Sequence, residues 1–131
     1  MQKTQIMGYI FYNKIDLKEG KVYSLYDLTK ELGSKDKNGY NSCLVKDKFG
    51  NEYYHIHEVI IAEGLKLPKH LWPTDETGKR YEVDHKTPIK NGGTDSFKNL
   101  RLVSKKDNMN NEHSIINMSV ARIGKKFITT N

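Results

Sequence analysis

The sequence predicts a small α+β fold, in which a β-rich N-terminal module with one helix is followed by a strand, strand, helix motif and a C-terminal helix. Short runs of aromatic and β-branched residues, typical of strands, fill much of the first half of the chain. Helical and alternating apolar patterns follow them. With 131 residues, of which 36% are hydrophobic, the chain can bury one modest core. We therefore expect residues 1–70 and 71–131 to pack as one compact unit.

The N-terminal module is predicted to contain strands over Gly8–Asn13 and Lys21–Tyr26, where aromatic and β-branched residues gather. The segment Asp27–Leu32 fits either a helical turn or an extended chain. Two further runs, Tyr40–Lys46 and Glu52–Ile56, are separated by a short gap that contains glycine, which predicts a β-hairpin.

A helix is predicted over His57–Lys66, because four aliphatic side chains fall near one helical face and Pro68 marks its end. This helix should cover the sheet. The segment Lys69–Lys79 has no clear periodicity and reads as a connector. Its Trp72 could stack on a nucleobase, but a tryptophan beside a leucine more often anchors a loop to the core.

The segment 81–85 alternates in polarity and is predicted to be a strand. Tyr81, Val83 and His85 then lie on one face, and Glu82 and Asp84 lie on the other. Because the pleat separates the Asp84 and His85 side chains, we expect a local bend to bring both into one site.

A turn, a second strand and a helix are predicted to follow. Gly92 and Gly93 permit a tight turn, and the apolar segment 100–103 is a second short strand. Ser104 can cap a helix that has Asp107 at its third position. The tail 114–126 has apolar residues at near-helical spacing and predicts the C-terminal helix.

The order of these elements predicts a metal site with a nearby base. It would bring Asp84, His85 and Asn108 close together, and a carboxylate with an amide oxygen suits one Mg²⁺, with Mn²⁺ as a second choice. His85 would then act as a base. No structural zinc is expected, because Cys43 is the single cysteine. His55 and His57 read as packed or exposed side chains.

The positive charge is concentrated beside this predicted site. Residues 1–83 hold 13 Lys/Arg against 12 Asp/Glu, whereas residues 84–131 hold 9 against 4, which gives +5 of the total +6. Such a field favours a polyanionic substrate, although a solubilising surface is an equal alternative. The candidates for phosphate contacts are the basic residues of this half: Lys86, Lys90, Lys98, Arg101, Lys105, Lys106, Arg122, Lys125 and Lys126.

The stretch 81–113 resembles the motif of the HNH endonuclease family, the ββα-metal finger. The matching residues, in the family's order, are Asp84, His85, Pro88, Gly92, Gly93, Asn99, Leu100 and Asn108. The resemblance implies that Asp84 and Asn108 bind the metal and that His85 is the general base. It also implies that Asn99 holds the loop between the strands. The upstream half is similar to the small module that precedes this motif in phage and intron-borne homing nucleases.

We therefore predict a metal-dependent endonuclease of a phage or mobile element that cleaves DNA phosphodiesters to 5′-phosphate and 3′-hydroxyl ends. A monomer would nick and a dimer could cut both strands, and the oligomeric state is left open. The alternative is a DNA-binding or DNA-packaging accessory protein that keeps the HNH scaffold with little nuclease activity. The sequence has no apolar run of about 18 residues and no export pattern, so we expect no membrane partner and a place in the host cell interior, which disfavours a secreted toxin. Roles for Asn110, Asn111 and His113 stay open.

Overall fold

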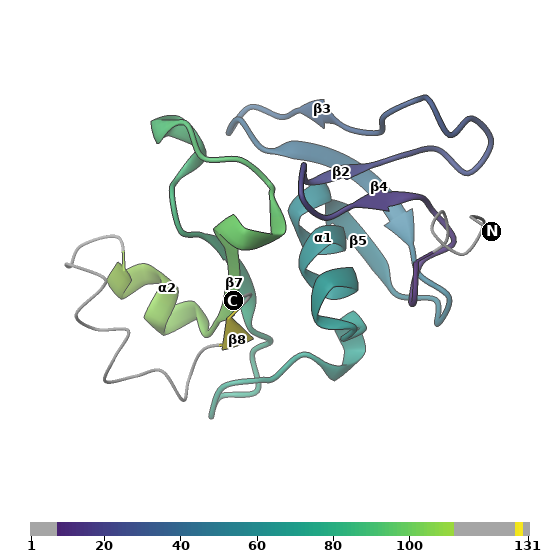
Figure 1. The fold of residues 1–131 in the computed structure, drawn as a ribbon. Coiled ribbons are helices and arrows are strands. Elements are labelled where there is room, and N and C mark those ends of the chain that lie inside the picture. Colours follow the sequence, from purple (N-terminus) through teal and green to yellow (C-terminus); the bar gives the residue numbers. More distant parts are fainter. Residues whose placement is uncertain (1–7, 112–127, 130–131) are drawn as a thin grey trace.

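The computed structural model describes residues 8–111 and 128–129 and shows a mixed α+β arrangement, as predicted (Figure 1). In chain order, with η for 3₁₀ helices, the elements are β1 (Ile15–Asp16), β2 (Lys21–Val22), β3 (Ser34–Lys35), β4 (Asn41–Lys46), β5 (Glu52–His55), α1 (Ile56–Leu65), η2 (Lys69–Leu71), β6 (Glu82–His85), η3 (Ile89–Asn91), η4 (Phe97–Asn99), β7 (Leu100–Val103), α2 (Lys105–Asn111) and β8 (Ile128–Thr129). The predicted C-terminal helix over 114–126 lies outside the described residues.

The described strands form three small antiparallel sheets, with the orders β1-β2, β3-β4-β5 and β6-β7-β8. In the third sheet Asp84 of β6 lies opposite Arg101 of β7, and His85 lies opposite Leu100. β8 pairs with β7 on its other side, and this strand was not predicted. The predicted hairpin is confirmed as β4 and β5. The two strands pair from Ser42 and His55 to Lys46 and Glu52 beside the turn, with one register shift.

The turn of this hairpin is organised by the buried carboxylate of Asp47. Its Oδ2 accepts hydrogen bonds from the Tyr53 hydroxyl at 2.7 Å and the Asn51 side chain at 2.9 Å. Its Oδ1 accepts from the backbone N–H groups of Phe49 and Asn51 at 2.8 and 3.0 Å. Burial of the carboxyl opposes ionisation, but these hydrogen bonds outweigh it and hold the pKa of Asp47 below its ordinary value of 3.8.

We expect Asp47→Asn to lower the free energy of unfolding at pH 7 by about 1–3 kcal/mol, because an amide cannot accept hydrogen bonds through both of its polar atoms. The pKa of Asp47 is lower in the fold than in the unfolded chain. The advantage of the wild-type protein is therefore complete above about pH 4 and is lost as the pH falls through the folded-state value. Urea unfolding of both proteins at pH 7 and below pH 3 measures this difference.

Asp75→Asn is the matched control, since Asp75 accepts from the Thr77 and Lys79 backbone in a similar but more exposed turn. Its effect should be smaller. An Asp47→Asn variant whose deficit is the same at both pH values would contradict the assignment of the stabilisation to the ionised carboxylate.

The N-terminal segment departs from its prediction. Gly8–Asn13 is not a strand, because the backbone N–H groups of Tyr9 and Ile10 donate to the Glu63 carboxylate of α1 instead of to a neighbouring strand. Lys21–Tyr26 is extended only over β2. The segment left open after it is neither helix nor strand, apart from a single bridge between Tyr23 and Glu31.

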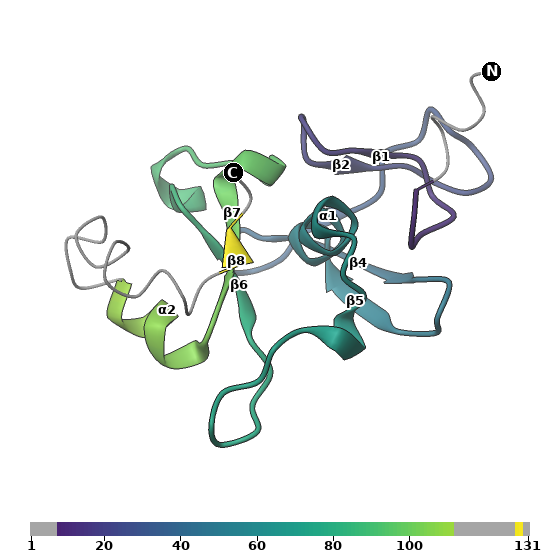
Figure 2. The same ribbon diagram turned by 60° about the horizontal axis from the view of Figure 1, so that its bottom comes forward.

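Helix α1, predicted from its aliphatic pattern, lies at the centre of the structure. Figure 2, which looks nearly along α1, shows the N-terminal strands on one side of the helix and β6, β7 and α2 on the other. Its Ile56, Ile60 and Ile61 are fully buried and share one apolar core with Leu100 and Leu102 of β7. An apolar helix buried on several sides is what this arrangement requires.

Trp72 anchors the connector to this core, as predicted. The residue is 5% exposed, and its Nε1–H donates to the Leu67 carbonyl at 2.9 Å. No helix of the described residues is both long and apolar enough to cross a bilayer.

Candidate functional site

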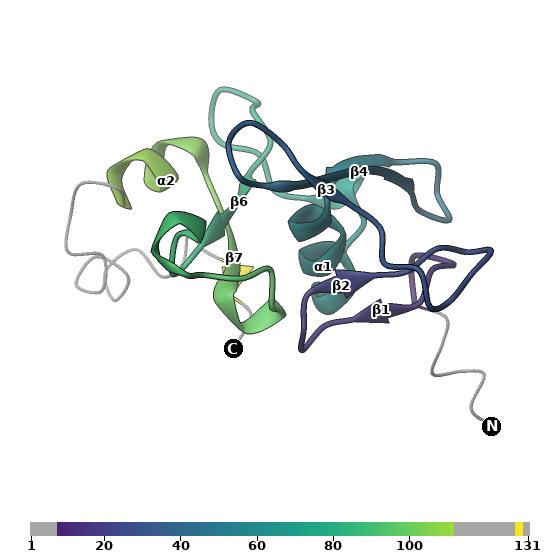
Figure 3. The same ribbon diagram turned by 90° about the horizontal axis from the view of Figure 1, so that it is seen from above.

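The end of β6 lies between two helices, so its two faces meet different partners. Figure 3 shows β6 and β7 with α1 on one side and α2 on the other. Tyr81 and Val83 pack against the core that contains α1, and His85 shares their face by alternation. Glu82 and Asp84 are on the face that meets α2. The alternation predicted from the sequence is therefore present, and it separates the side chains of Asp84 and His85.

The α2 face collects acidic and amide groups. The Asn108 side-chain N–H₂ donates to Glu82 Oε2 at 2.7 Å, and Asp84 lies two residues along the same face of β6. The hydrogen bond uses the nitrogen of the Asn108 amide and not its carbonyl oxygen. Helix α2 begins where predicted, because the Asp107 N–H donates to the Ser104 hydroxyl at 3.0 Å. The structure thus brings Asp84 and Asn108 to one face and adds Glu82, which the sequence had not singled out.

Arg101 belongs to this cluster and does not lie on the outer surface. Its Nε–H donates to Asp84 Oδ2 at 2.8 Å across the two strands, and the residue is only 7% exposed. This placement differs from the phosphate contact expected of Arg101, because a buried guanidinium engaged with a carboxylate is poorly placed to meet a DNA backbone. A pair this buried depends on both partners, since removing one leaves the other charge buried.

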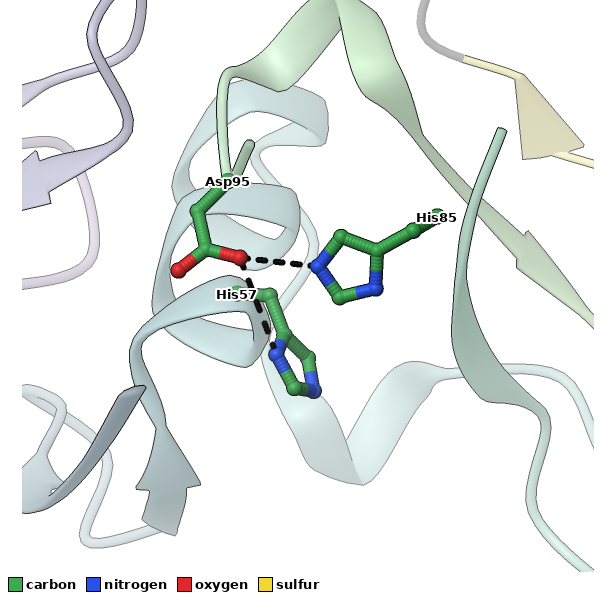
Figure 4. A group of neighbouring side chains, drawn as sticks. All are labelled: His57, His85 and Asp95. Carbon is green, nitrogen blue, oxygen red and sulfur yellow. Dashed lines mark hydrogen bonds and ion pairs between the residues drawn. The ribbon is translucent and has the colours of Figure 1, made fainter. Parts of the chain in front are cut away.

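The α1 face holds a second cluster, shown in Figure 4. His85 Nε2 lies 2.8 Å from Asp95 Oδ1, in the loop that follows η3, and His57 Nδ1 of α1 lies 3.9 Å from the same oxygen. Tyr40 stacks on the His85 ring at 5.7 Å between centroids and meets the His57 ring edge-on. The second nitrogen of His85 points away from Asp95 (Figure 4).

His57 is the most perturbed histidine of this cluster. Burial lowers its pKa to about 3; the neighbouring His85 also lowers it, while Asp95 acts in the opposite direction. At neutral pH His57 is therefore an uncharged imidazole. Its Nδ1 is buried and has no hydrogen-bond partner among the described residues.

The loop between β6 and β7 is held by Asn99. Its side-chain N–H₂ donates to the carbonyls of Thr87 at 3.0 Å and Thr94 at 2.8 Å, and its Oδ1 accepts from the Thr87 N–H at 2.8 Å. Gly92 ends η3 with φ of 91°, and Gly93 packs against the Thr87 carbonyl so closely that no side chain would fit. The loop that carries Asp95 is thus fixed at both ends to the strands.

The remaining basic candidates divide by exposure. Lys90, Lys98, Lys105 and Lys106 are exposed, and Lys86 is half-buried with its pKa lowered by burial and by Arg101. The described part of the chain does not include the other basic candidates, Arg122, Lys125 and Lys126. Of the residues whose roles the sequence left open, His113 also lies outside it, and the side chains of Asn110 and Asn111 are not described.

Sequence reasoning missed His57, Asp95 and Glu82 as members of these clusters. His57 was interpreted as packed or exposed, although a histidine on the apolar face of a buried helix could have drawn attention to it. Asp95 follows the glycine turn without any pattern of its own. Nothing local indicated that the two would meet at His85.

Comparison with known proteins assigns this part of the chain to a class. The family model described as HNH endonuclease matches residues 72–114, which contain β6, β7 and α2. Residues 72–114 therefore match an HNH domain, which indicates a nuclease-type function with nucleic acid as substrate and a divalent metal as the usual cofactor. No curated protein and no solved structure matched the chain.

Proposed function

We propose that the protein is a divalent-metal-dependent DNA endonuclease that hydrolyses phosphodiester bonds and nicks DNA when it acts as a monomer. The observation that carries this proposal is the HNH match over β6, its loop, β7 and α2. The four site residues predicted from the sequence lie in this segment: Asp84, His85, Asn99 and Asn108. An origin in a phage or mobile element, as in homing-type nucleases, is part of the proposal.

The donor atoms on the α2 face fit a hard divalent cation. Asp84 supplies an anionic oxygen and Asn108 a neutral amide oxygen, and Glu82 adds negative charge beside them. Such oxygen donors suit Mg²⁺ first and Mn²⁺ second, with several waters retained. When bound, the metal would stabilise negative charge on the phosphate and on the leaving 3′ oxygen.

His85 is the proposed general base. Its Nε2 faces Asp95, so the neutral ring that carries its hydrogen on Nε2 donates it to the carboxylate and keeps the Nδ1 lone pair for a proton. A water at the end of β6 would give that proton to Nδ1 while its oxygen attacks the phosphorus. Asp95 then positions the ring and offsets the charge that the ring gains.

Asn99 and the exposed lysines have supporting roles in the proposal. By tying Thr87 to Thr94, Asn99 fixes the loop that carries Asp95 and so the orientation of His85. Exposed lysines such as Lys98 and Lys105 would contact phosphates and position the DNA without selecting its sequence.

Removal of metal is the first test of this function. We expect supercoiled plasmid to be converted to the nicked form in Mg²⁺ or Mn²⁺, to stay intact in EDTA, and to be nicked again when Mg²⁺ is restored in excess. Sequencing of the cleaved ends should show 5′-phosphate and 3′-hydroxyl groups. Inactivity with every divalent metal tried would overturn the nuclease proposal.

One observation favours the second candidate, a DNA-binding or packaging accessory protein with an HNH scaffold. The Asp84 carboxylate is engaged by Arg101 at 2.8 Å, and a metal must compete with that guanidinium. If the ion pair prevails, the protein would bind DNA with similar affinity in Mg²⁺ and in EDTA and would cleave in neither.

A further inference from the structure

Three potential metal ligands meet between α1 and the end of β6, and the proposed nuclease chemistry does not use them as a metal site. They are His57, His85 and Asp95, and one ligand atom from each lies within 4.8 Å of those of the other two. The side chains are 11%, 7% and 11% exposed. They come from α1, from the end of β6 and from the loop beyond η3, so only the folded chain assembles them (Figure 4).

His57 gives an independent indication that something binds here. The residue is 9% exposed, and its Nδ1 is buried without a hydrogen-bond partner among the described residues. A buried polar atom without a partner is costly. Asp95 Oδ1 is 3.9 Å away, which is too far for a hydrogen bond but suits two ligands of one ion.

We propose that His57, His85 and Asp95 form a binding site for a transition-metal dication of the Zn²⁺ type, separate from the oxygen-rich face at Asp84 and Asn108. Zinc bonds to imidazole nitrogen and carboxylate oxygen at about 2.0–2.2 Å, so the ligands of a tetrahedral site lie about 3.3–3.5 Å apart. The ligand atoms here are 2.8 and 3.9 Å from Asp95 Oδ1, on either side of that spacing. Shifts of about half an ångström would equalise these two distances.

The chemistry of the ligands selects the class of ion. Two imidazoles and one carboxylate suit Zn²⁺ and its neighbours, whereas Mg²⁺ prefers oxygen ligands and keeps several waters. His57 is ready to act as a ligand, because burial keeps its ring neutral at pH 7. Asp95 also borders a cavity of about 290 Å³, lined in part by Gly93 and Thr94.

Occupancy of this site has a consequence that rests on the proposed nuclease function. An ion on His85 Nε2 displaces the proton that Nε2 gives to Asp95. A neutral imidazole carries one N–H, so in the metal-bound ring that hydrogen is on Nδ1, which can then donate but not accept. The proposed base is thereby disabled, and Zn²⁺ should inhibit Mg²⁺-supported cleavage by acting on the α1 face.

Metal binding is tested directly on the full chain, purified without a histidine tag and stripped of metals. Calorimetric titration with Zn²⁺ should show one tight site, and Co²⁺ should give the visible absorption of a four-coordinate ion with nitrogen and oxygen ligands. We expect His57→Gln and Asp95→Asn to weaken Zn²⁺ binding at least about 100-fold, beyond the 10- to 100-fold typical of an outer partner. Circular dichroism shows whether each variant is folded.

His55→Asn is the matched control. The His55 ring stacks on His57 at 4.9 Å but is not one of the three ligands, and asparagine preserves the helix cap that this position provides. This variant should bind Zn²⁺ like the wild type. Folded His57→Gln and Asp95→Asn proteins that bind Zn²⁺ as tightly as the wild type would overturn the site, as would an equal loss in His55→Asn.

Inhibition is measured separately, with each variant compared with its own rate in Mg²⁺. The Zn²⁺ concentration that halves cleavage should match the Zn²⁺ affinity in the wild type and should rise at least about 100-fold in His57→Gln. Equal inhibition of both proteins would refute the proposed mode of inhibition. A protein that binds Zn²⁺ as described but never cleaves DNA supports the metal site and overturns the nuclease function alone.

Discussion

His85→Ala should lower the rate of metal-dependent DNA cleavage by about 10³-fold, within the range that a general base contributes. The loss is expected in the rate at saturating DNA, because His85 is proposed to act on the attacking water and its side chain is only 7% exposed. DNA affinity and thermal stability should change little by comparison. Single-turnover nicking, together with a binding isotherm for each protein, separates these quantities.

His70→Ala is the control for the loss of an imidazole. His70 lies in η2, and its ring contacts Asn51 at 2.9 Å, away from the β6 clusters. That variant should cleave at the wild-type rate. A His85→Ala protein that retains cleavage within about tenfold of wild type, an effect of 1.4 kcal/mol or less, would exclude His85 as the base.

Asp84→Ala should lose cleavage by about 10²–10³-fold and should also destabilise the fold by about 3–5 kcal/mol. The first effect follows from the removal of the proposed anionic metal ligand. The second follows because the Arg101 guanidinium would stay buried without the Asp84 carboxylate, to which it donates at 2.8 Å. Nicking rates over a range of Mg²⁺ concentrations and urea unfolding of the same protein measure the two effects.

The double variant Asp84→Leu with Arg101→Met separates the loss of the metal ligand from the loss of stability. Replacing both members of a buried ion pair by apolar residues is often neutral for stability, so the free energy of unfolding should recover. Cleavage should not recover, because the metal ligand is still missing. If the double variant regains both stability and cleavage, Asp84 acts through the fold and not through the metal.

The local pattern of the sequence was enough to predict the elements that carry the HNH domain. The alternation of 81–85, the glycine turn and the Ser104 cap are short-range signals, and β6, β7 and α2 form where those signals indicated. The hairpin of β4 and β5 was predictable for the same reason. The prediction of a strand over Gly8–Asn13 was wrong, because the backbone N–H groups of Tyr9 and Ile10 donate to the side chain of the distant Glu63.

The sequence by itself determined which face of β6 each side chain occupies, since the two-residue period of a strand is a property of the backbone. It therefore placed the His85 side chain on the face of β6 that Asp84 does not occupy. Only the tertiary structure decided what each face meets: Asn108 and Arg101 on the α2 side, and His57 with Asp95 on the α1 side. The reason is that these contacts depend on how α1, which precedes β6 in the chain, and α2, which follows it, pack against the strand. No local periodicity in the sequence predicts that packing. The bend expected to join Asp84 and His85 is not present, and the two side chains belong to separate clusters at the end of β6.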